Sequence, residues 1–336
     1  MPLRRLLPPL ATLTIALAAL FALACGDDAD EATADAMATA TTATRTATGS
    51  PATGAVAFPL TVKDMLGKDV TIPAAPQRIV ATSPSAIEIL YAAGGTSVAR
   101  TSTARFPAEV ASLPDIGRAE QLAFEQVVAQ RPDLVLADAS LQAQVATQLA
   151  SALGGVPVVF VGATKYDDVA TALRLVGRIV GKPAVAEAAA KAMDNAKATA
   201  KAAAAGKAAP KTLVIIGAPN DPYAALPESF VGDVLALAGG TNVAAGLPAN
   251  APFPGYTKLS LERIVTGAPD VVLTVTVGRP GGPSLADGIK GDAGYATLPA
   301  VKQGRVHNID VEVFLQAPSP RAAEGLASLT KLLFPQ

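Results

Sequence analysis

Residues Phe124–Leu136, FEQVVAQRPDLVL, are repeated in similar form as Leu261–Leu273, LERIVTGAPDVVL. This internal repeat is the main indication of the fold. A second pair precedes each copy: Glu88–Gly95, EILYAAGG, matches Asp233–Gly240, DVLALAGG. The copies lie about 140 residues apart, far beyond the roughly 20–50-residue periods of solenoid repeats. The repeat therefore indicates two lobes of similar architecture, and a cleft between two lobes is a common place for a ligand.

The composition narrows the classes of function. The chain has 336 residues, enough for two domains, and half of them are hydrophobic. Lys and Arg number 27 against 28 Asp and Glu, so the basic surface of a nucleic-acid-binding protein is not expected. A single Cys excludes an intramolecular disulfide, and a single His argues against the His-rich sites that hold free zinc or manganese. We expect no resident metal or cofactor.

The N-terminus has the pattern of an export signal. Arg4 and Arg5 precede an uncharged run, Leu6–Ala24, and the small residues around Cys25 follow. Cys25 lies where a bacterial lipobox places its lipidated cysteine, so residues 1–25 are interpreted as a lipoprotein signal peptide. The alternative is an uncleaved membrane anchor. In both cases the rest of the chain lies outside the cytoplasm, tethered to a membrane.

Residues 26–56 are rich in Ala and Thr and lack aromatic residues. Such a segment cannot bury enough surface to offset its ordering entropy, so we expect a disordered tether that reaches roughly 30 Å on average. The folded body then divides into an N-terminal lobe, residues 57–182, and a C-terminal lobe, residues 208–336.

Within the body, short β-rich runs alternate with helical patterns after an expected hairpin at residues 57–72. This order predicts an α/β fold with a Rossmann-like parallel sheet in each lobe. The expected strands are Arg78–Ala81, Leu134–Ala137, Val156–Val161, Thr212–Ile216, Val271–Val275 and Arg305–Ile309.

Residues 183–207 lie between the lobes and are rich in Ala and Lys. Pro183 suits the first turn of a helix and Gly206 suits its end, so we expect one long rigid helix to join the lobes. The alternative is a partly disordered linker. A rigid helix would permit only a small closure of the lobes around a ligand.

The body resembles the helical-backbone class of substrate-binding proteins of ABC importers, which bind iron–siderophore complexes, haem or cobalamin. Besides the two repeats, the segments that carry the resemblance are VKDMLGKDVTIP (62–73), PQRIV (76–80), SPSAIEIL (83–90), LPDIG (113–117), AGGTNV (238–243) and VKQGRV (301–306). The resemblance covers about residues 57–334, essentially the whole folded body. The resemblance implies a protein that catalyses nothing and delivers a captured nutrient to a permease dimer.

In that family an acidic residue on each lobe docks onto arginines of the permease. The resemblance assigns Glu88 to the first position, and the internal repeat selects Asp233 as its counterpart. Two alternatives stay open: Glu88 could complete a capping box with Ser85, and Asp233 could be an ordinary first-turn acid of a helix. Glu228 is a nearby competitor for the second position.

The ligand is expected at the carboxyl ends of the strands, facing the crevice between the lobes. Large planar cargo needs flat apolar contacts and a few polar groups, and arginines pair with anionic groups. The candidates in the expected loops are Arg105, Phe106, Tyr166, Tyr223, Phe253, Tyr256 and Arg279. For each aromatic residue the alternative is packing within its own loop.

Haem iron is often held by Tyr or His. We expect the one His, His307, to lie in the core or at a sheet edge. The loop Thr101–Pro107 lacks the tyrosine that family members often carry just before this proline, which argues against haem ligation there and also against the usual cobalamin contact.

The sequence therefore predicts an extracytoplasmic lipoprotein that binds a metal chelate for an ABC importer. One alternative is a ligand sensor on the same fold. Another is an exported enzyme, against which the chain has no Gly-x-Ser-x-Gly elbow, phosphate loop or His-Glu-x-x-His motif.

Overall fold

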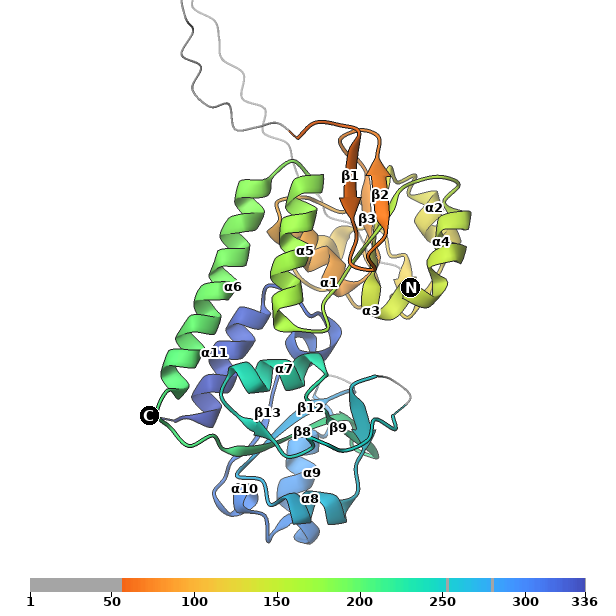
Figure 1. The fold of residues 1–336 in the computed structure, drawn as a ribbon. Coiled ribbons are helices and arrows are strands. Elements are labelled where there is room, and N and C mark those ends of the chain that lie inside the picture. The colour runs from red at the N-terminus through yellow and green to blue at the C-terminus, as the bar shows by residue number, and fades with distance from the viewer. Residues whose placement is uncertain (1–55, 252–253, 279–280, 336) are drawn as a thin grey trace, which may run out of the picture. The chain divides into compact units, whose positions relative to one another are not determined.

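The computed structural model describes residues 56–251, 254–278 and 281–335 (Figure 1). The predicted signal peptide with Cys25 and nearly all of the predicted tether lie outside the described residues. Ala52–Gln336 forms one compact unit of the chain.

The first element is the expected hairpin. Strands β1 (Leu60–Lys63) and β2 (Asp69–Ile72) pair antiparallel. Gly67 turns the chain between them with a φ of 79°, a left-handed conformation that glycine adopts without steric cost. The Asp64 carboxylate accepts hydrogen bonds from the backbone of Leu66 and Lys68, which fixes the turn.

The first half of the body is built on a parallel sheet with the order β3-β6-β7. Its strands are β3 (Ile79–Ala81), β6 (Leu134–Asp138) and β7 (Val158–Val161). Every residue of β3 and β6 is buried, as expected of parallel strands covered on both faces. The other elements of this half are α1 (Pro84–Ala92), η1 (Ala108–Ser112), β4 (Gly117–Arg118), β5 (Gln121–Leu122), α2 (Phe124–Ala129), α3 (Ala139–Gln142), η2 (Ala143–Val145), α4 (Ala146–Ala152) and α5 (Tyr166–Ile179).

The second half has a mixed sheet with the order β11-β9-β8-β12-β13, and β10 also pairs with β8. Its strands are β8 (Lys211–Ala218), β9 (Asp221–Ala225), β10 (Thr241–Asn242), β11 (Tyr256–Lys258), β12 (Val271–Thr276) and β13 (Val306–Asn308). Strands β8, β12 and β13 are parallel, whereas β9 and β11 extend the sheet in antiparallel fashion. The helices are α7 (Phe230–Leu237), α8 (Leu261–Gly267), α9 (Leu285–Gly291), η3 (Ala293–Tyr295), α10 (Pro299–Lys302), the π-helical turn η4 (Glu312–Gln316) and α11 (Ala322–Leu333).

The helix α6 (Pro183–Ala204) lies where the sequence predicts the connection between the halves. Its 22 residues make it about 33 Å long. It packs against α5 and α11, and its buried residues are Ala186, Ala190, Met193 and Ala200. A Cβ atom added to Gly177 in α5 would lie 2.2 Å from the Cβ of Ala186, so small side chains allow α5 and α6 to approach closely.

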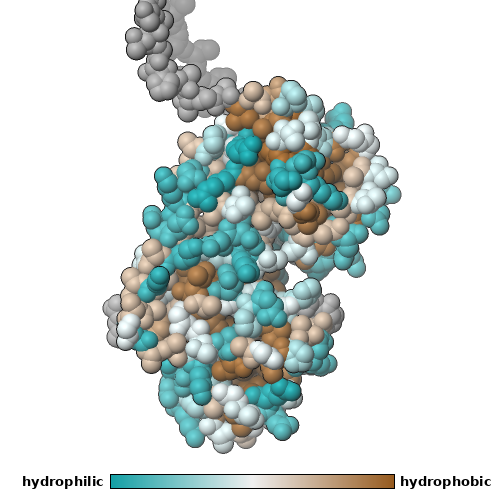
Figure 2. All heavy atoms as spheres, in the orientation of Figure 1, coloured by the Kyte–Doolittle hydropathy of each residue, from teal (hydrophilic) through white to brown (hydrophobic). Residues whose placement is uncertain are grey.

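All six predicted strands are confirmed, with shifts of up to two residues at their ends. The second sheet differs from the expected parallel sheet because β9 and β11 make it mixed. Two expected cleft loops were wrong: residues 220–223 run into β9, and Tyr256 begins β11. Among the described residues, no helix is both long and apolar enough to cross a bilayer. The face drawn in Figure 2 carries hydrophilic and hydrophobic residues interspersed.

Candidate functional site

A hollow of about 470 Å³ lies at the carboxyl ends of β12 and β13. The two strands are parallel and adjacent, so Thr276 and Asn308, their last residues, reach the same edge of the sheet. The residues that line the hollow are Thr276, Asn308, Ile309, Asp310, Val311 and Glu312. This is the edge at which the sequence predicts the ligand.

Hydrogen bonds hold the polar groups of this hollow in fixed positions. The Asn308 Oδ1 atom accepts from the hydroxyls of Thr274 at 3.0 Å and Thr276 at 2.8 Å. The Asp310 carboxylate accepts from the backbone N–H groups of Glu312 and Val313, which fixes the start of η4. A ligand would therefore meet a preorganised polar wall.

Glu312 joins the hollow to a second group of residues centred on Arg321. Nη2 of Arg321 lies 3.5 Å from Glu312 Oε2 and donates to Glu88 Oε1 at 2.5 Å. The Nε atom of Arg321 donates to the other oxygen of Glu88 at 2.8 Å, so this pair is bidentate. The hydroxyl of Ser319 also donates to Glu88 Oε2, at 2.6 Å. Hydrogen bonding to Glu88 raises the pKa of Arg321 above its ordinary value, so its charge is permanent.

Phe106 completes this group. The carbon of the Arg321 guanidinium lies 4.9 Å from the centre of the Phe106 ring, within the range of a cation–π contact. The ring is 46% exposed, although it is large and apolar. Phe106 comes from the first half and Glu312 from the second, so Arg321 connects a predicted ligand residue to the hollow.

The structure corrects the assignment of Tyr166. Because Lys165 is already the N-cap of α5, Tyr166 is the first residue of that helix and not part of a cleft loop. Its side chain is 1% exposed and its hydroxyl donates to the carbonyl of Met193 in α6. Burial, with the charges of Asp167 and Asp194, raises the pKa of Tyr166. Tyr166 is a core residue.

Tyr223 and Tyr256 are also buried and belong to paired strands, β9 and β11. The Tyr223 hydroxyl donates to Asp221 at 2.8 Å, and this bond raises the pKa of Tyr223. Burial raises the pKa of Tyr256 to about 12. Neither residue lies in the loop position that the sequence suggested.

The structure describes no contact of the other three predicted ligand residues with this site. Arg105 is exposed beside Phe106, in keeping with a role at the edge of a site. Phe253 and Arg279 lie outside the described residues, and Arg279 follows Thr276 of the hollow closely in sequence.

Glu88 does not stand open to a partner protein. Only 4% of it is exposed, and its carboxylate is occupied by Ser319 and Arg321, just before α11. The capping-box alternative is wrong: Ser83, not Ser85, caps α1, and the Ser85 hydroxyl donates to the carbonyl of Pro318. Asp233 is half-buried, and its Oδ2 atom accepts from the backbone N–H of Tyr166, at the start of α5. The two repeat-related acids thus share a role: each binds the N-terminal end of a helix from the other half.

The opening repeat contains a second pair of acids that sequence reasoning passed over. Glu125 in α2 and Glu262 in α8 occupy the same position of the repeat, in the first turn of their helices, and both are exposed. Three residues later, Val128 and Val265 are 42% and 39% exposed. The alignment of the repeat, extended to ask which matched residues are charged, would have identified the pair.

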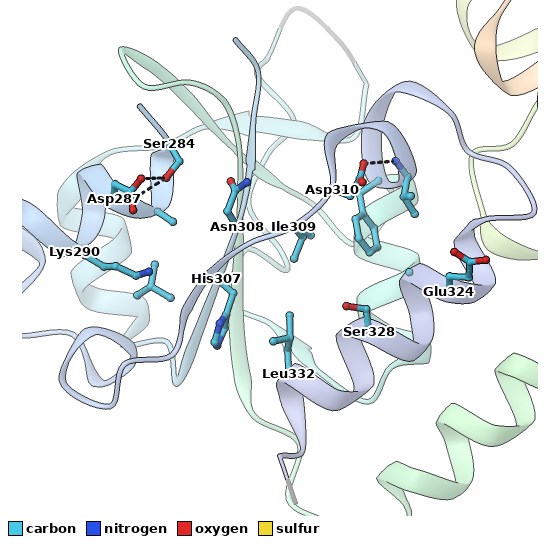
Figure 3. Close-up of a pocket in the computed structure, with 15 residues that line it drawn as sticks. Ser284, Asp287, Lys290, His307, Asn308, Ile309, Asp310, Glu324, Ser328 and Leu332 are labelled. Atoms are coloured by element: carbon cyan, nitrogen blue, oxygen red, sulfur yellow. Dashed lines mark hydrogen bonds between the residues drawn. The ribbon is translucent and has the colours of Figure 1, made fainter. Parts of the chain in front are cut away.

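A larger hollow of about 710 Å³ lies between α9, β13 and α11 (Figure 3). Lys290 and His307 line it from α9 and β13, and Ser328 and Leu332 from α11. The expected place of His307 at a sheet edge is confirmed, since β13 is an edge strand of its sheet. Burial, with the nearby charges of Lys290 and Arg305, lowers the pKa of His307. In the part of the chain that the structure describes, no three His, Cys, Asp or Glu side chains are grouped to hold a metal.

Comparison with known proteins agrees with this architecture. The substrate-binding lipoprotein YvrC of Bacillus subtilis, an uncharacterized ABC transporter protein, is 28% identical over 292 residues, or 83% of this chain and 86% of its own. A cobalamin-binding protein of Halobacterium salinarum is 30% identical over 291 residues, covering 83% of this chain and 75% of its own. A periplasmic heme binding protein from Pseudomonas aeruginosa superposes with a TM-score of 0.67 at 28% identity, covering 78% and 94% of the two chains. The family model for periplasmic binding proteins matches residues 79–313, and the chain belongs to this family.

Proposed function

We propose that this protein is the solute-binding lipoprotein of an ABC importer and that its cargo is a corrinoid of the cobalamin type. Members of its family are binding proteins that work outside the cytoplasm with a permease. The proposed identity of the cargo rests on the 30% identity, over 83% of the chain, to a protein named for cobalamin binding. The lipid on Cys25, as part of this proposal, would anchor the body to the membrane.

The chemistry of the site favours a corrinoid over haem. Haem capture often relies on a tyrosine whose phenolate binds the iron. Tyr166, Tyr223 and Tyr256 are buried, and the pKa of each is raised, which disfavours the phenolate. A cobalamin already carries its own axial base and requires no protein ligand on its metal.

A corrinoid presents amide side chains around a flat, largely apolar ring. The hollow at β12 and β13 offers hydroxyl, amide and carboxylate groups, and Phe106 offers an exposed aromatic face. Polar groups around an apolar contact are typical of sites for such ligands. Arg105 and Arg279 are proposed to meet anionic groups of the cargo.

For the permease, we propose docking through Glu125 and Glu262 in place of Glu88. A docking acid has to reach arginines on another protein, and the exposed pair can do so whereas the bonded carboxylate of Glu88 cannot. Repeat-related acids in the two halves suit a two-fold symmetric partner. Docking by Asp233 stays a prediction.

The proposal is tested by thermal unfolding of the protein with cyanocobalamin, cobinamide, haemin and two ferric siderophores. A ligand that binds only the folded state at a hundredfold excess over its Kd adds about 2.7 kcal/mol of stability. We expect cyanocobalamin and cobinamide to raise the Tm and the siderophores to leave it unchanged. A rise in Tm with haemin alone would show that the cargo is haem and not a corrinoid. An unchanged Tm with every compound would refute the proposed cargo.

A further inference from the structure

Arg321 makes contacts that no other described residue combines. Its guanidinium binds Glu88 of the first half through two nitrogens, approaches Glu312 of the second half, and lies over the ring of Phe106. Glu312 lines the hollow at the ends of β12 and β13, and Phe106 is the exposed aromatic of the first half. One side chain therefore touches groups on both sides of the proposed cargo site.

The pair with Glu88 explains why the guanidinium stays in place. Glu88 is almost fully buried and Arg321 is 17% exposed, so solvent screens the interaction weakly. The planar fork of Arg matches the two carboxylate oxygens and leaves its face free to carry an aromatic ring. Lys keeps the charge but can reproduce neither the fork nor the stacked face.

An exposed phenyl ring on a loop is free to change rotamer unless something holds it. The described contact of the Phe106 ring is with Arg321, whose own orientation is fixed by a buried partner. The ring keeps an apolar face in water, which is unfavourable in the empty protein and useful when a flat ligand covers it.

We propose that Arg321 is a positioning residue of the cargo site: pinned by Glu88, it holds the Phe106 ring at a set distance from the polar wall that begins at Glu312. Arg321 thereby determines which cargo fits between the aromatic face and the wall. The inference rests on the proposed function for the identity of the cargo, but not for the placement of the ring.

The placement of the ring is tested without any ligand. The chain contains no Trp, so Phe106→Trp introduces a single fluorescent indole. We expect high emission anisotropy for this variant and a clear fall when Arg321→Lys is added. The matched control adds Arg100→Lys, which alters another ion-paired arginine, 3.4 Å from Asp115. Equal anisotropy with and without Arg321→Lys would overturn the proposal.

The consequence for cargo is tested by a double-mutant cycle on the Kd for cyanocobalamin. We expect Phe106→Ala and Arg321→Lys each to weaken binding about tenfold, and the double variant to be no weaker than either single one. A purely structural Arg321 would give losses that multiply, which would contradict the proposal. If Arg321→Lys does not fold, Phe106→Leu is used in its place, because it removes the aromatic face and leaves the buried pair of Arg321 and Glu88 intact. We expect Phe106→Leu to weaken binding without lowering the Tm.

If the wild-type protein binds no corrinoid, the proposed function fails, and haemin or the siderophore that does bind takes its place in the cycle. The anisotropy result then still decides whether Arg321 holds the ring.

Discussion

Glu88 and Asp233 occupy the same position of the internal repeat, one in each half of the body. Their equivalence follows from the sequence, and the structure gives them one role, to bind the start of a helix from the opposite half. Their exposure does not follow from the sequence, because it depends on where Ser319 and Arg321 lie, more than two hundred residues after Glu88.

Replacing Glu88 by Ala is expected to destabilise the protein by about 3 kcal/mol, the lower end of the range for a broken buried pair, because Arg321 keeps only its 3.5 Å contact with Glu312. Denaturant unfolding measures this change. Asp69→Ala is the control, since Asp69 forms an exposed pair with Lys63 and should change stability by less than about 1 kcal/mol. A loss at Glu88 as small as that of the control would show that the pair is dispensable.

The environment of His307 predicts how the stability of the protein depends on pH. Its pKa is lowered in the folded protein, mainly by burial and further by Lys290 and Arg305, so the unfolded chain binds this proton first. The stability linked to His307 is present above the ordinary pKa of about 6.5 and is lost as the pH falls below it. We expect His307→Gln to reduce the fall in Tm between pH 7.5 and 5.5. An unchanged fall, or an NMR titration of this one imidazole above pH 6.5, would contradict the expectation.

The three tyrosines mark the limit of prediction from sequence at this scale. Tyr166 and Tyr223 follow a strand closely and Tyr256 lies in a stretch rich in Pro and Gly, all of which are typical of cleft loops. In the structure Tyr166 starts a helix and the other two lie in strands. A shift of one residue in a helix start moves a side chain from a loop into the core, and the sequence pattern does not resolve such shifts.

Among the helices and strands, alternation and turn signals predicted the parallel strands of both halves, because buried parallel strands form short runs of Val, Ile and Leu. Strands β9 and β11 were not predicted. They contain Pro222, Ala224 and Lys258, which are poor strand formers. Their conformation is decided by pairing, of β9 with β8 and of β11 with β9.

The close contact between α5 and α6 predicts that adding a methyl group to Gly177 destabilises the protein, whereas helix propensity alone would predict stabilisation. Gly177→Ala is expected to destabilise the protein by about 1–3 kcal/mol, because the new methyl group meets Ala186. Gly288→Ala in α9 is the control: nothing lies within 4 Å of its added Cβ, so it should stabilise by up to about 1 kcal/mol. Urea unfolding of both variants measures these changes in the free energy of unfolding. A stabilising Gly177→Ala would show that α5 and α6 are packed loosely.

At the scale of the whole molecule, the repeated exposed acids make a prediction about the permease. Glu125→Lys and Glu262→Lys together are expected to reduce stimulation of the permease ATPase by about tenfold or more, because like charges would then face its arginines. The Kd for cargo should stay unchanged. Asp69→Lys, on the hairpin and without a counterpart in the repeat, should leave stimulation intact, and an effect of equal size there would point to a general effect of charge.

The most direct test of the account is equilibrium dialysis of the protein against cyanocobalamin, with Phe106→Ala beside the wild type. We expect one corrinoid to be retained per chain and binding to be about tenfold weaker in the variant. Retention of no corrinoid by the wild-type protein, at concentrations where it is folded, would contradict the central claim.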